Sequence, residues 1–201
     1  MKKFSLVQTL ALLAVATTLA ACGGGNNSTA TAEKNATTNA AASTGGAVAG
    51  TPFTSDAGGF AVTLPAGFAP FREKKNEATK MTGYTSSGPN NVACNVSYSE
   101  FSDELASQLD TPEKLDKALG AMRDNSIAGM NGILDKEEKI SVQGHPGLSI
   151  SGTIPGEQIG YFRMNNVIAR ARGYRFGCLS TSKDELDKPE IQSFFNSFKL
   201  K

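Results

Sequence analysis

An abrupt change in composition at residue 51 constrains most strongly what this chain can fold into. Residues 23–50 contain no aromatic residue and no Leu, Ile or Met, and Val48 is their largest apolar side chain. Such a segment cannot bury enough apolar surface to offset the entropy lost on ordering its backbone. Residues 51–201 carry all but one of the phenylalanines and are long enough for one hydrophobic core. We therefore predict a disordered tether over residues 22–50 and a single domain over residues 51–201.

The first 22 residues have the layout of a secretory signal. Two lysines precede a short apolar run, residues 4–16, and small residues then lead to Cys22. The last four residues of this stretch, LAAC, resemble the bacterial lipobox. The resemblance implies that residues 1–21 are removed as a signal peptide, that the Cys22 thiol carries a diacylglyceryl group, and that its amine receives a fatty acyl chain such as palmitate. An ordinary signal peptide with a cysteine nearby is the alternative.

The predicted lipid anchor places the protein on a membrane of the bacterial cell envelope. Each buried methylene contributes about 0.8 kcal/mol, so two or more acyl chains hold a protein stably. Gly23, rather than an aspartate, follows Cys22. By resemblance to the sorting pattern of enterobacterial lipoproteins, this implies the outer membrane, with the domain facing the periplasm. No segment after Cys22 is long and apolar enough in the sequence to span a bilayer.

The charge of the mature chain argues against nucleic acid as its main partner. Removal of Lys2 and Lys3 with the signal leaves 18 basic and 19 acidic residues, a net charge of −1 with histidine neutral. Binding to nucleic acid is driven largely by the neutralisation of phosphates with Lys and Arg. We expect instead that the partners are the membrane, through the lipid anchor, and an envelope protein of unknown identity.

Alternation and turn signals predict mostly antiparallel strands in the domain. Val92, Cys94, Val96 and Tyr98 alternate with small or polar residues, which is typical of a strand with one buried face. Short turns rich in glycine and proline separate the later strands, and short turns join antiparallel neighbours. Strands are expected at residues 59–65, 79–84, 91–101, 133–142, 147–154, 158–168 and 173–180.

Two helices are expected to cover this sheet, which gives an α+β fold class with a mostly antiparallel β-sheet flanked by helices. The sequence Thr111-Pro112-Glu113 favours a helix start, because it offers an N-cap, a proline at the first helical position and an acid in the first turn. A second helix starts at about Pro189. The expected core-facing residues are Leu115, Ala118, Leu119 and Met122 in the first helix, and Ile191, Phe194, Phe195 and Phe198 in the second.

Three short motifs resemble the PsbP-like superfamily. They are GFAVTLP at residues 59–65, GHPG at residues 144–147 and FFNSF at residues 194–198. Their layout behind a low-complexity tether is similar to the DcrB branch of bacterial lipoproteins. The resemblance spans roughly residues 52–200. It implies an α/β/α sandwich that serves protein interaction or assembly, without catalysis and without a cofactor.

Few residues in the domain are suited to catalysis or metal binding. The cysteines left after lipidation, Cys94 and Cys178, are not part of the DcrB pattern. We predict that they form a disulfide, because export places them in an oxidising compartment; separate buried thiols are the alternative. The single histidine, His145, lies between Gly and Pro in an expected turn, where a catalytic base lacks a positioned partner. No zinc site and no catalytic residue are therefore expected.

The arginines are unevenly distributed. Four of the six, Arg163, Arg170, Arg172 and Arg175, fall within thirteen residues. We place Arg170 and Arg172 in the turn between two strands, where they either keep a hairpin soluble or form a cationic tip that contacts lipid headgroups, lipopolysaccharide or an acidic partner.

Three classes of function remain open from the sequence. The leading hypothesis is a non-enzymatic envelope lipoprotein that serves protein interaction or assembly. The alternative is a small-ligand or lipid carrier with a pocket between sheet and helix. A hydrolase is the third, but the sequence offers no set of nucleophile, base and orienting residue.

Overall fold

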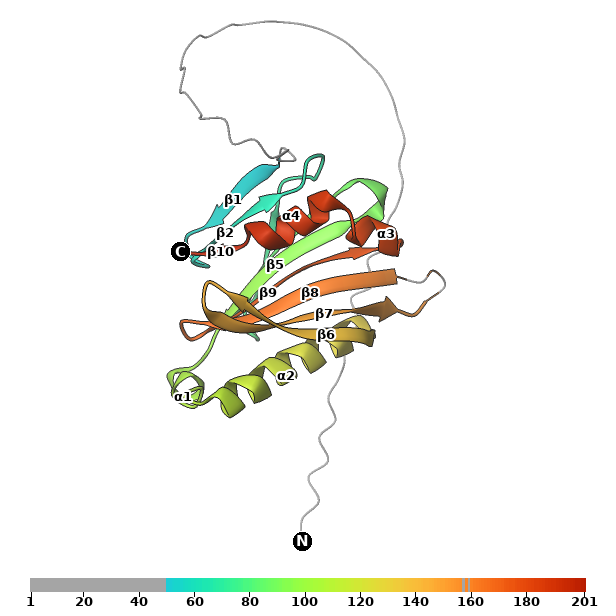
Figure 1. Cartoon of the computed structure of the whole chain (residues 1–201). Coiled ribbons are helices and arrows are strands. Elements are labelled where there is room, and N and C mark those ends of the chain that lie inside the picture. Colours follow the sequence, from blue (N-terminus) through green and yellow to red (C-terminus); the bar gives the residue numbers. More distant parts are fainter. Residues whose placement is uncertain (1–49, 157, 159) are drawn as a thin grey trace, which may run out of the picture. The chain divides into compact units, whose positions relative to one another are not determined.

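The computed structural model describes residues 50–156, 158 and 160–201, so the predicted signal peptide, Cys22 and nearly all of the tether lie outside the described residues. The domain is built around a seven-stranded sheet with the order β3-β4-β5-β9-β8-β7-β6. Figure 1 labels the run from β5 to β6. Every neighbouring pair is antiparallel. Its strands are β3 (Arg72–Asn76), β4 (Met81–Ser87), β5 (Ala93–Glu100), β6 (Ile133–Val142), β7 (His145–Ile154), β8 (Gly160–Ala169) and β9 (Arg172–Ser180).

A small antiparallel sheet, β1-β2-β10, packs with the C-terminal helices on one face of the large sheet. Aromatic rings fill the core between these layers. The ring of Phe198 stacks on Phe176 with centroids 4.1 Å apart, and on Phe60 with centroids 5.6 Å apart. The elements of this layer are β1 (Thr51–Ser55), β2 (Phe60–Leu64), α3 (Lys183–Leu186), α4 (Pro189–Ser197) and β10 (Lys199–Leu200).

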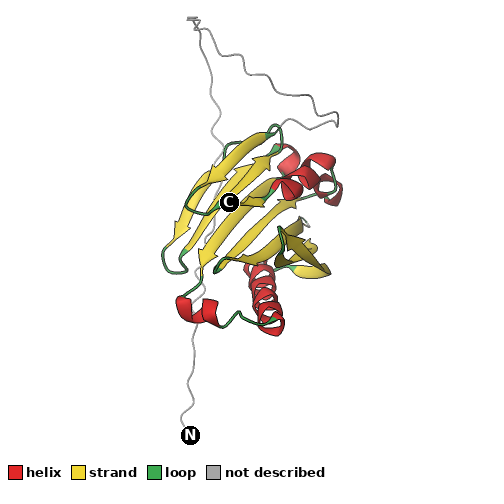
Figure 2. Ribbon diagram, turned by 60° about the vertical axis from the view of Figure 1, so that its left-hand side comes forward, coloured by secondary structure: helices red, strands yellow, loops and turns green. Residues whose placement is uncertain are grey.

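Helix α2 (Pro112–Met130) covers part of the opposite face, where it packs against β7 and β8 (Figure 1 and Figure 2). It begins where the sequence predicts, because the Thr111 side chain accepts a hydrogen bond from the Lys114 N–H and Pro112 follows. It ends at Asn131, which has a left-handed backbone with φ of 51°. The remaining short elements are α1 (Asp103–Ser107) and a 3-10 turn (Pro89–Asn91).

These layers confirm the predicted α+β fold class with its mostly antiparallel sheet between helices. The predicted core faces are also correct. In α4, Ile191, Phe194 and Phe195 are buried, as is Phe198 just after it, and in α2 Leu119 lies in a second, smaller core. No helix among the described residues is long and apolar enough to cross a membrane.

Three strands were missed in the sequence, namely β1, β3 and the two-residue β10, and one turn is shifted. All five residues of β3 are exposed, so this strand shows no alternation of apolar and polar residues. Strand β1 contains Pro52, which is tolerated because β1 is an edge strand. The turn expected at residues 144–147 instead uses Gln143 and Gly144, both with positive φ, so β7 already begins at His145.

Candidate functional site

Each face of the large sheet is covered over only part of its width. On one face α2 covers β7 and β8, and on the other α3, α4 and the small sheet cover mainly β5, β9 and part of β8. Hollowed areas therefore remain on both faces of the described domain: two adjoining ones on the α4 face, which share Glu138, Ser149 and Arg163, and one on the α2 face. We name the two on the α4 face together the β6–β8 trough, beside α3 and α4, and the third the α2 groove, between α2 and the strands β3–β5.

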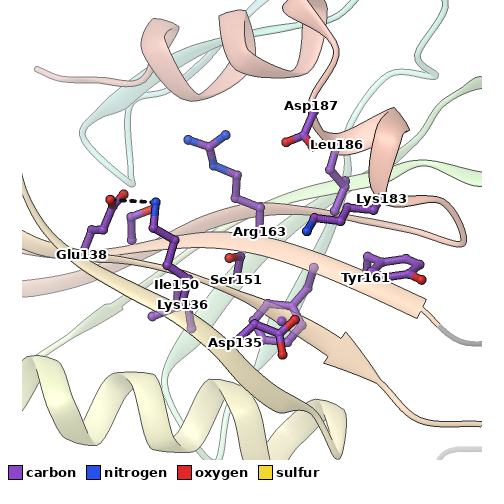
Figure 3. A pocket seen from close by; sticks show the side chains of 13 residues that line it. Asp135, Lys136, Glu138, Ile150, Ser151, Tyr161, Arg163, Lys183, Leu186 and Asp187 are labelled. Atoms are coloured by element: carbon purple, nitrogen blue, oxygen red, sulfur yellow. Dashed lines mark ion pairs between the residues drawn. The ribbon is translucent and has the colours of Figure 1, made fainter.

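The β6–β8 trough contains a pocket of about 280 Å³ (Figure 3). Lys136, Ser151 and Arg163 lie in register on β6, β7 and β8, and residues directly opposite one another point to the same face of a sheet. Leu186 and Asp187 line the side toward α3. Polar side chains from three adjacent strands thus form one continuous surface.

Arg163 lies on the side of the trough that faces α4. Its Nη1 donates a hydrogen bond of 2.6 Å to Oε1 of Gln192, and its guanidinium lies 5.0 Å from the ring centroid of Phe195. Figure 3 shows the side chain rising from β8 toward α4. These two contacts hold the guanidinium in place. Because an arginine carries five N–H donors, the remaining ones are still available to a partner.

Both signs of charge surround the pocket. Lys136 Nζ lies 2.8 Å from Glu138 Oε1. The hydrogen bond from Lys136, aided by its positive charge, lowers the pKa of Glu138 below its ordinary value. Three basic and three acidic side chains line the pocket: Lys136, Arg163 and Lys183, and Asp135, Glu138 and Asp187. This balance suits a protein surface of mixed charge better than a single ion.

Two apolar side chains are exposed near the trough, one on each face of β6. Ile133 and Leu134, at the start of β6, have 56% and 37% of their surface exposed. They directly precede Asp135 and Lys136 of the pocket lining. Strand β6 is an edge strand, because it pairs with β7 alone. Ile133 pairs with Thr153 and lies on the face of the trough, whereas Leu134 pairs with Gly152 and lies on the opposite face. An exposed apolar side chain bordered by polar groups favours an interaction surface at this edge.

The α2 groove is larger, with a volume of about 620 Å³. It lies where the carrier hypothesis expects a pocket, but polar side chains share its lining with apolar ones. At its inner end Arg175 Nε lies 3.3 Å from Oδ1 of Asn166, and burial lowers the pKa of Arg175 from its ordinary value. The residues contributed by α2 are Asn125, Ser126, Gly129 and Met130.

Cys94 and Cys178 form a disulfide between β5 and β9, as the sequence predicts. The two residues are directly opposite in the strand register, with Cα atoms 4.0 Å apart. Both side chains are buried in the larger core, so neither lines one of the two open areas. A disulfide of this kind is typical of proteins that fold in an oxidising compartment.

Arg170 lies in the β8–β9 turn, as predicted, whereas Arg172 is already the first residue of β9. Both side chains also make contacts within the domain. Arg170 Nη1 donates to the carbonyl oxygen of Lys201. Arg172 Nη2 lies 2.6 Å from Glu100 Oε1, and its Nη1 donates a 3.0 Å hydrogen bond to the carbonyl oxygen of Ala57. Contact of these two arginines with a partner stays a prediction.

The other predicted site residues are distributed as follows. His145 is partly buried as the first residue of β7, opposite Val142. No group of three or more His, Cys, Asp or Glu in the part of the chain that the structure describes could hold a metal ion. Cys22, the predicted lipidation site, lies outside that part.

Sequence reasoning noticed Arg163 and Arg175 only as members of an arginine cluster. The structure places them on opposite faces of the sheet, Arg163 beside α4 and Arg175 beside α2. The missing signal was the pairing of strands. Arg163 lies opposite Cys178 on β9, whereas Arg175 is three residues from Cys178 on that same strand and so points to the other face.

Comparison with known proteins reveals similarity at the level of the fold. No protein-family model matches the chain, and no curated protein sequence matches it. The solution structure of cyanobacterial PsbP (CyanoP) from Synechocystis has a TM-score of 0.57 and 12% identity, over 81% of this chain and 98% of that one. The Saccharomyces cerevisiae Ran-binding protein Mog1p has a TM-score of 0.49 and 11% identity, over 77% and 96%.

Proposed function

With the PsbP-like fold of the domain as premise, we propose that the protein is a non-catalytic, lipid-anchored binding module of the cell envelope. Its partner is another envelope protein, which docks on the β6–β8 trough and the adjoining start of β6. The observation that carries this proposal is the trough itself. It combines oriented polar groups of both charge signs with the exposed side chain of Ile133 at its edge.

Two features support the envelope location. The sequence LAAC before residue 23 resembles a lipobox, which would fix the protein to a membrane through Cys22. The buried disulfide between Cys94 and Cys178 supports folding in an oxidising space such as the periplasm. The outer membrane, suggested by Gly23, is the membrane that we propose.

Site-specific photocrosslinking in the native envelope tests the docking surface. We expect a photoreactive residue in place of Lys136, which is exposed and lines the trough, to yield a discrete adduct with one envelope protein. The matched control is the same residue in place of Lys117, an exposed lysine of α2 outside the pocket linings. Equal adducts from both positions, or none from position 136, would contradict docking at the trough.

A small-ligand carrier is the second candidate function, and the α2 groove is the observation that favours it. A volume of about 620 Å³ lies within the range of small-molecule sites, and the groove opens between sheet and helix. The two candidates use opposite faces of the sheet, so variants in one area should leave the other function intact.

A further inference from the structure

The floor of the α2 groove is hollow because the strands below it carry small side chains. Gly83 of β4 pairs with Lys74 of β3 on one side and with Ser97 of β5 on the other. A Cβ atom added to Gly83 would have no neighbour closer than 3.8 Å. Helix α2 packs on β7 and β8 and leaves this part of the sheet open.

One cross-strand row places two basic residues at the ends of this floor. Lys74, Gly83, Ser97 and Arg175 lie in register on β3, β4, β5 and β9. Neighbouring strands are about 4.8 Å apart, so the backbones of Lys74 and Arg175 are separated by roughly 14 Å. Two extended basic side chains can therefore reach one molecule that lies over Gly83 and Ser97.

Arg175 is a partly buried cation without a carboxylate partner. It donates to Oδ1 of Asn166 at 3.3 Å and to the carbonyl oxygen of Met122 at 3.4 Å, and it takes part in none of the ion pairs among the described residues. Burial lowers its pKa, yet an arginine stays protonated at neutral pH. A buried charge is normally compensated by an opposite charge, which a bound anion would supply.

Asn95 provides a second, independent sign of a ligand. Its Oδ1 is buried and has no hydrogen-bond partner among the described residues, and Asn95 lines the groove. Buried polar atoms without a partner are rare in native proteins. Rotation of the side-chain amide would turn its N–H groups to the same place, so Asn95 can meet either a donor or an acceptor of a ligand.

The remaining lining makes the groove net positive and partly apolar. Lys74, Lys75 and Arg175 line it against one acidic residue, Glu77. Lys75 Nζ lies 3.3 Å from Glu73, so Lys74 and Arg175 are the basic residues of the lining that form no ion pair in the described chain. The apolar residues include Met81, Met130, Met164 and Leu179.

We propose that the α2 groove binds a small organic anion, with its phosphate or carboxylate group at Arg175 and Lys74 and its body over Gly83 and Ser97. This inference rests on the second proposed function, that of a ligand carrier, and adds the chemical class of the ligand. Charge-assisted hydrogen bonds from Arg175 hold the anionic group, while the methionine side chains contact the apolar part.

Calorimetric titration with 1-naphthyl phosphate tests the proposal. The protein is the full lipidated chain in nanodiscs of phosphatidylcholine, and the matched ligand is 1-naphthol, which lacks the phosphate. We expect 1-naphthyl phosphate to bind with a Kd below about 1 mM and at least about tenfold more tightly than 1-naphthol. Arg175→Met should weaken the binding of the phosphate about tenfold, and Lys74→Ala about threefold, whereas Lys117→Ala should leave it unchanged.

Gly83→Val keeps the test valid if Arg175→Met fails to fold. Valine suits a strand and meets open space here, so the melting temperature should not fall while the side chain fills the groove. We expect at least about tenfold weaker binding, with Thr82→Val as the control on the opposite face of the same strand.

The outcomes separate the two levels of the proposal. Equal affinity for the phosphate and for 1-naphthol, both lost in Gly83→Val, would overturn the anion site and leave the carrier function standing. Binding of neither ligand up to millimolar concentration would overturn both. Undiminished binding of the phosphate to Gly83→Val would show that the groove is not the site.

Discussion

Cys94 and Cys178 lie directly opposite each other on β5 and β9, so their disulfide joins two central strands across 84 residues of sequence. Both cysteines lie in the aromatic core. Cys178 is also directly opposite Arg163 of β8, which lines the β6–β8 trough. The bond therefore ties the part of the chain before α2 to the strand that supports the proposed docking surface.

Loss of this disulfide should lower the free energy of unfolding. Constraint of the unfolded chain by a loop of this length stabilises the native state by roughly 4–5 kcal/mol in the chain-entropy model. We expect Cys94→Ala/Cys178→Ala to unfold at clearly lower urea concentration than the oxidised protein. Intact mass after alkylation without reductant is the accompanying measurement, and two alkylated cysteines in natively exported wild-type protein would contradict the bridge.

Phe198 should be one of the most costly positions to truncate. Its ring stacks on Phe176 and Phe60 in the core beneath the small sheet. We expect Phe198→Ala to lower the free energy of unfolding by about 3–5 kcal/mol, since it removes a large buried ring. Leu105→Ala is the control, because Leu105 is 42% exposed and should change stability little. Similar urea midpoints for the two variants would argue against this core.

The sequence predicts those elements in which buried apolar residues recur at the period of a strand or a helix. Strand β5 alternates buried and less buried residues along its length, and the buried Phe194 and Phe195 lie on the core-facing side of α4; both elements were predicted. Strand β3 was missed because its side chains are all exposed and carry no such pattern; its pairing with β4 defines it instead. Local periodicity reports burial, whereas the pairing of strands depends on distant residues.

The candidate sites were less accessible to sequence reasoning than the fold. The arginine cluster was visible in the sequence. Whether Arg163 and Arg175 share a face of the sheet, however, depends on the strand register, which must be known to the exact residue. The α2 groove exists because Gly83 and Ser97 lack large side chains, and no sequence motif marks the space that they leave. A pattern of small residues on a half-covered sheet becomes a site only when the neighbouring strands are known.

The lipid anchor can be tested independently of the domain. We expect Cys22→Ser to abolish incorporation of labelled fatty acid and to move the protein from the membrane to the soluble fraction, because serine lacks the thiol that carries the lipid. The control is Cys94→Ala/Cys178→Ala, in which Cys22 is intact and acylation should persist. Acylation of the Cys22→Ser protein, with fractionation like wild type, would rule out the predicted anchor.

Acid should weaken the ion pair between α3 and the start of α4. A hydrogen bond from Lys188, at 2.7 Å, lowers the pKa of Glu185 below its ordinary value. A depressed carboxyl pKa stabilises the native state above the unfolded pKa, and this contribution is lost as the pH falls through the folded pKa. We therefore expect Glu185→Gln to reduce the difference in melting temperature between pH 6 and pH 3. The control is Glu113→Gln, because Glu113 is exposed and forms no ion pair among the described residues.

Charge reversal at the β8–β9 turn should affect both stability and partner binding. Arg172→Glu would place a second carboxylate beside Glu100 and remove the hydrogen bond to Ala57, so we expect a loss of about 1–2 kcal/mol in the free energy of unfolding. Arg170→Glu loses one contact with Lys201 and should cost less. Both effects are measured by urea denaturation.

If the turn also contacts an acidic partner, the double variant Arg170→Glu/Arg172→Glu should capture less of the crosslinked partner than wild type, most clearly at low salt, where exposed charges are least screened. The control is Lys114→Glu/Lys117→Glu, which makes the same change in net charge on exposed positions of α2. Capture is compared at two ionic strengths and well below the melting temperature of every variant. Equal loss in both double variants would assign the effect to net charge, and undiminished capture would leave Arg170 and Arg172 with a structural role alone.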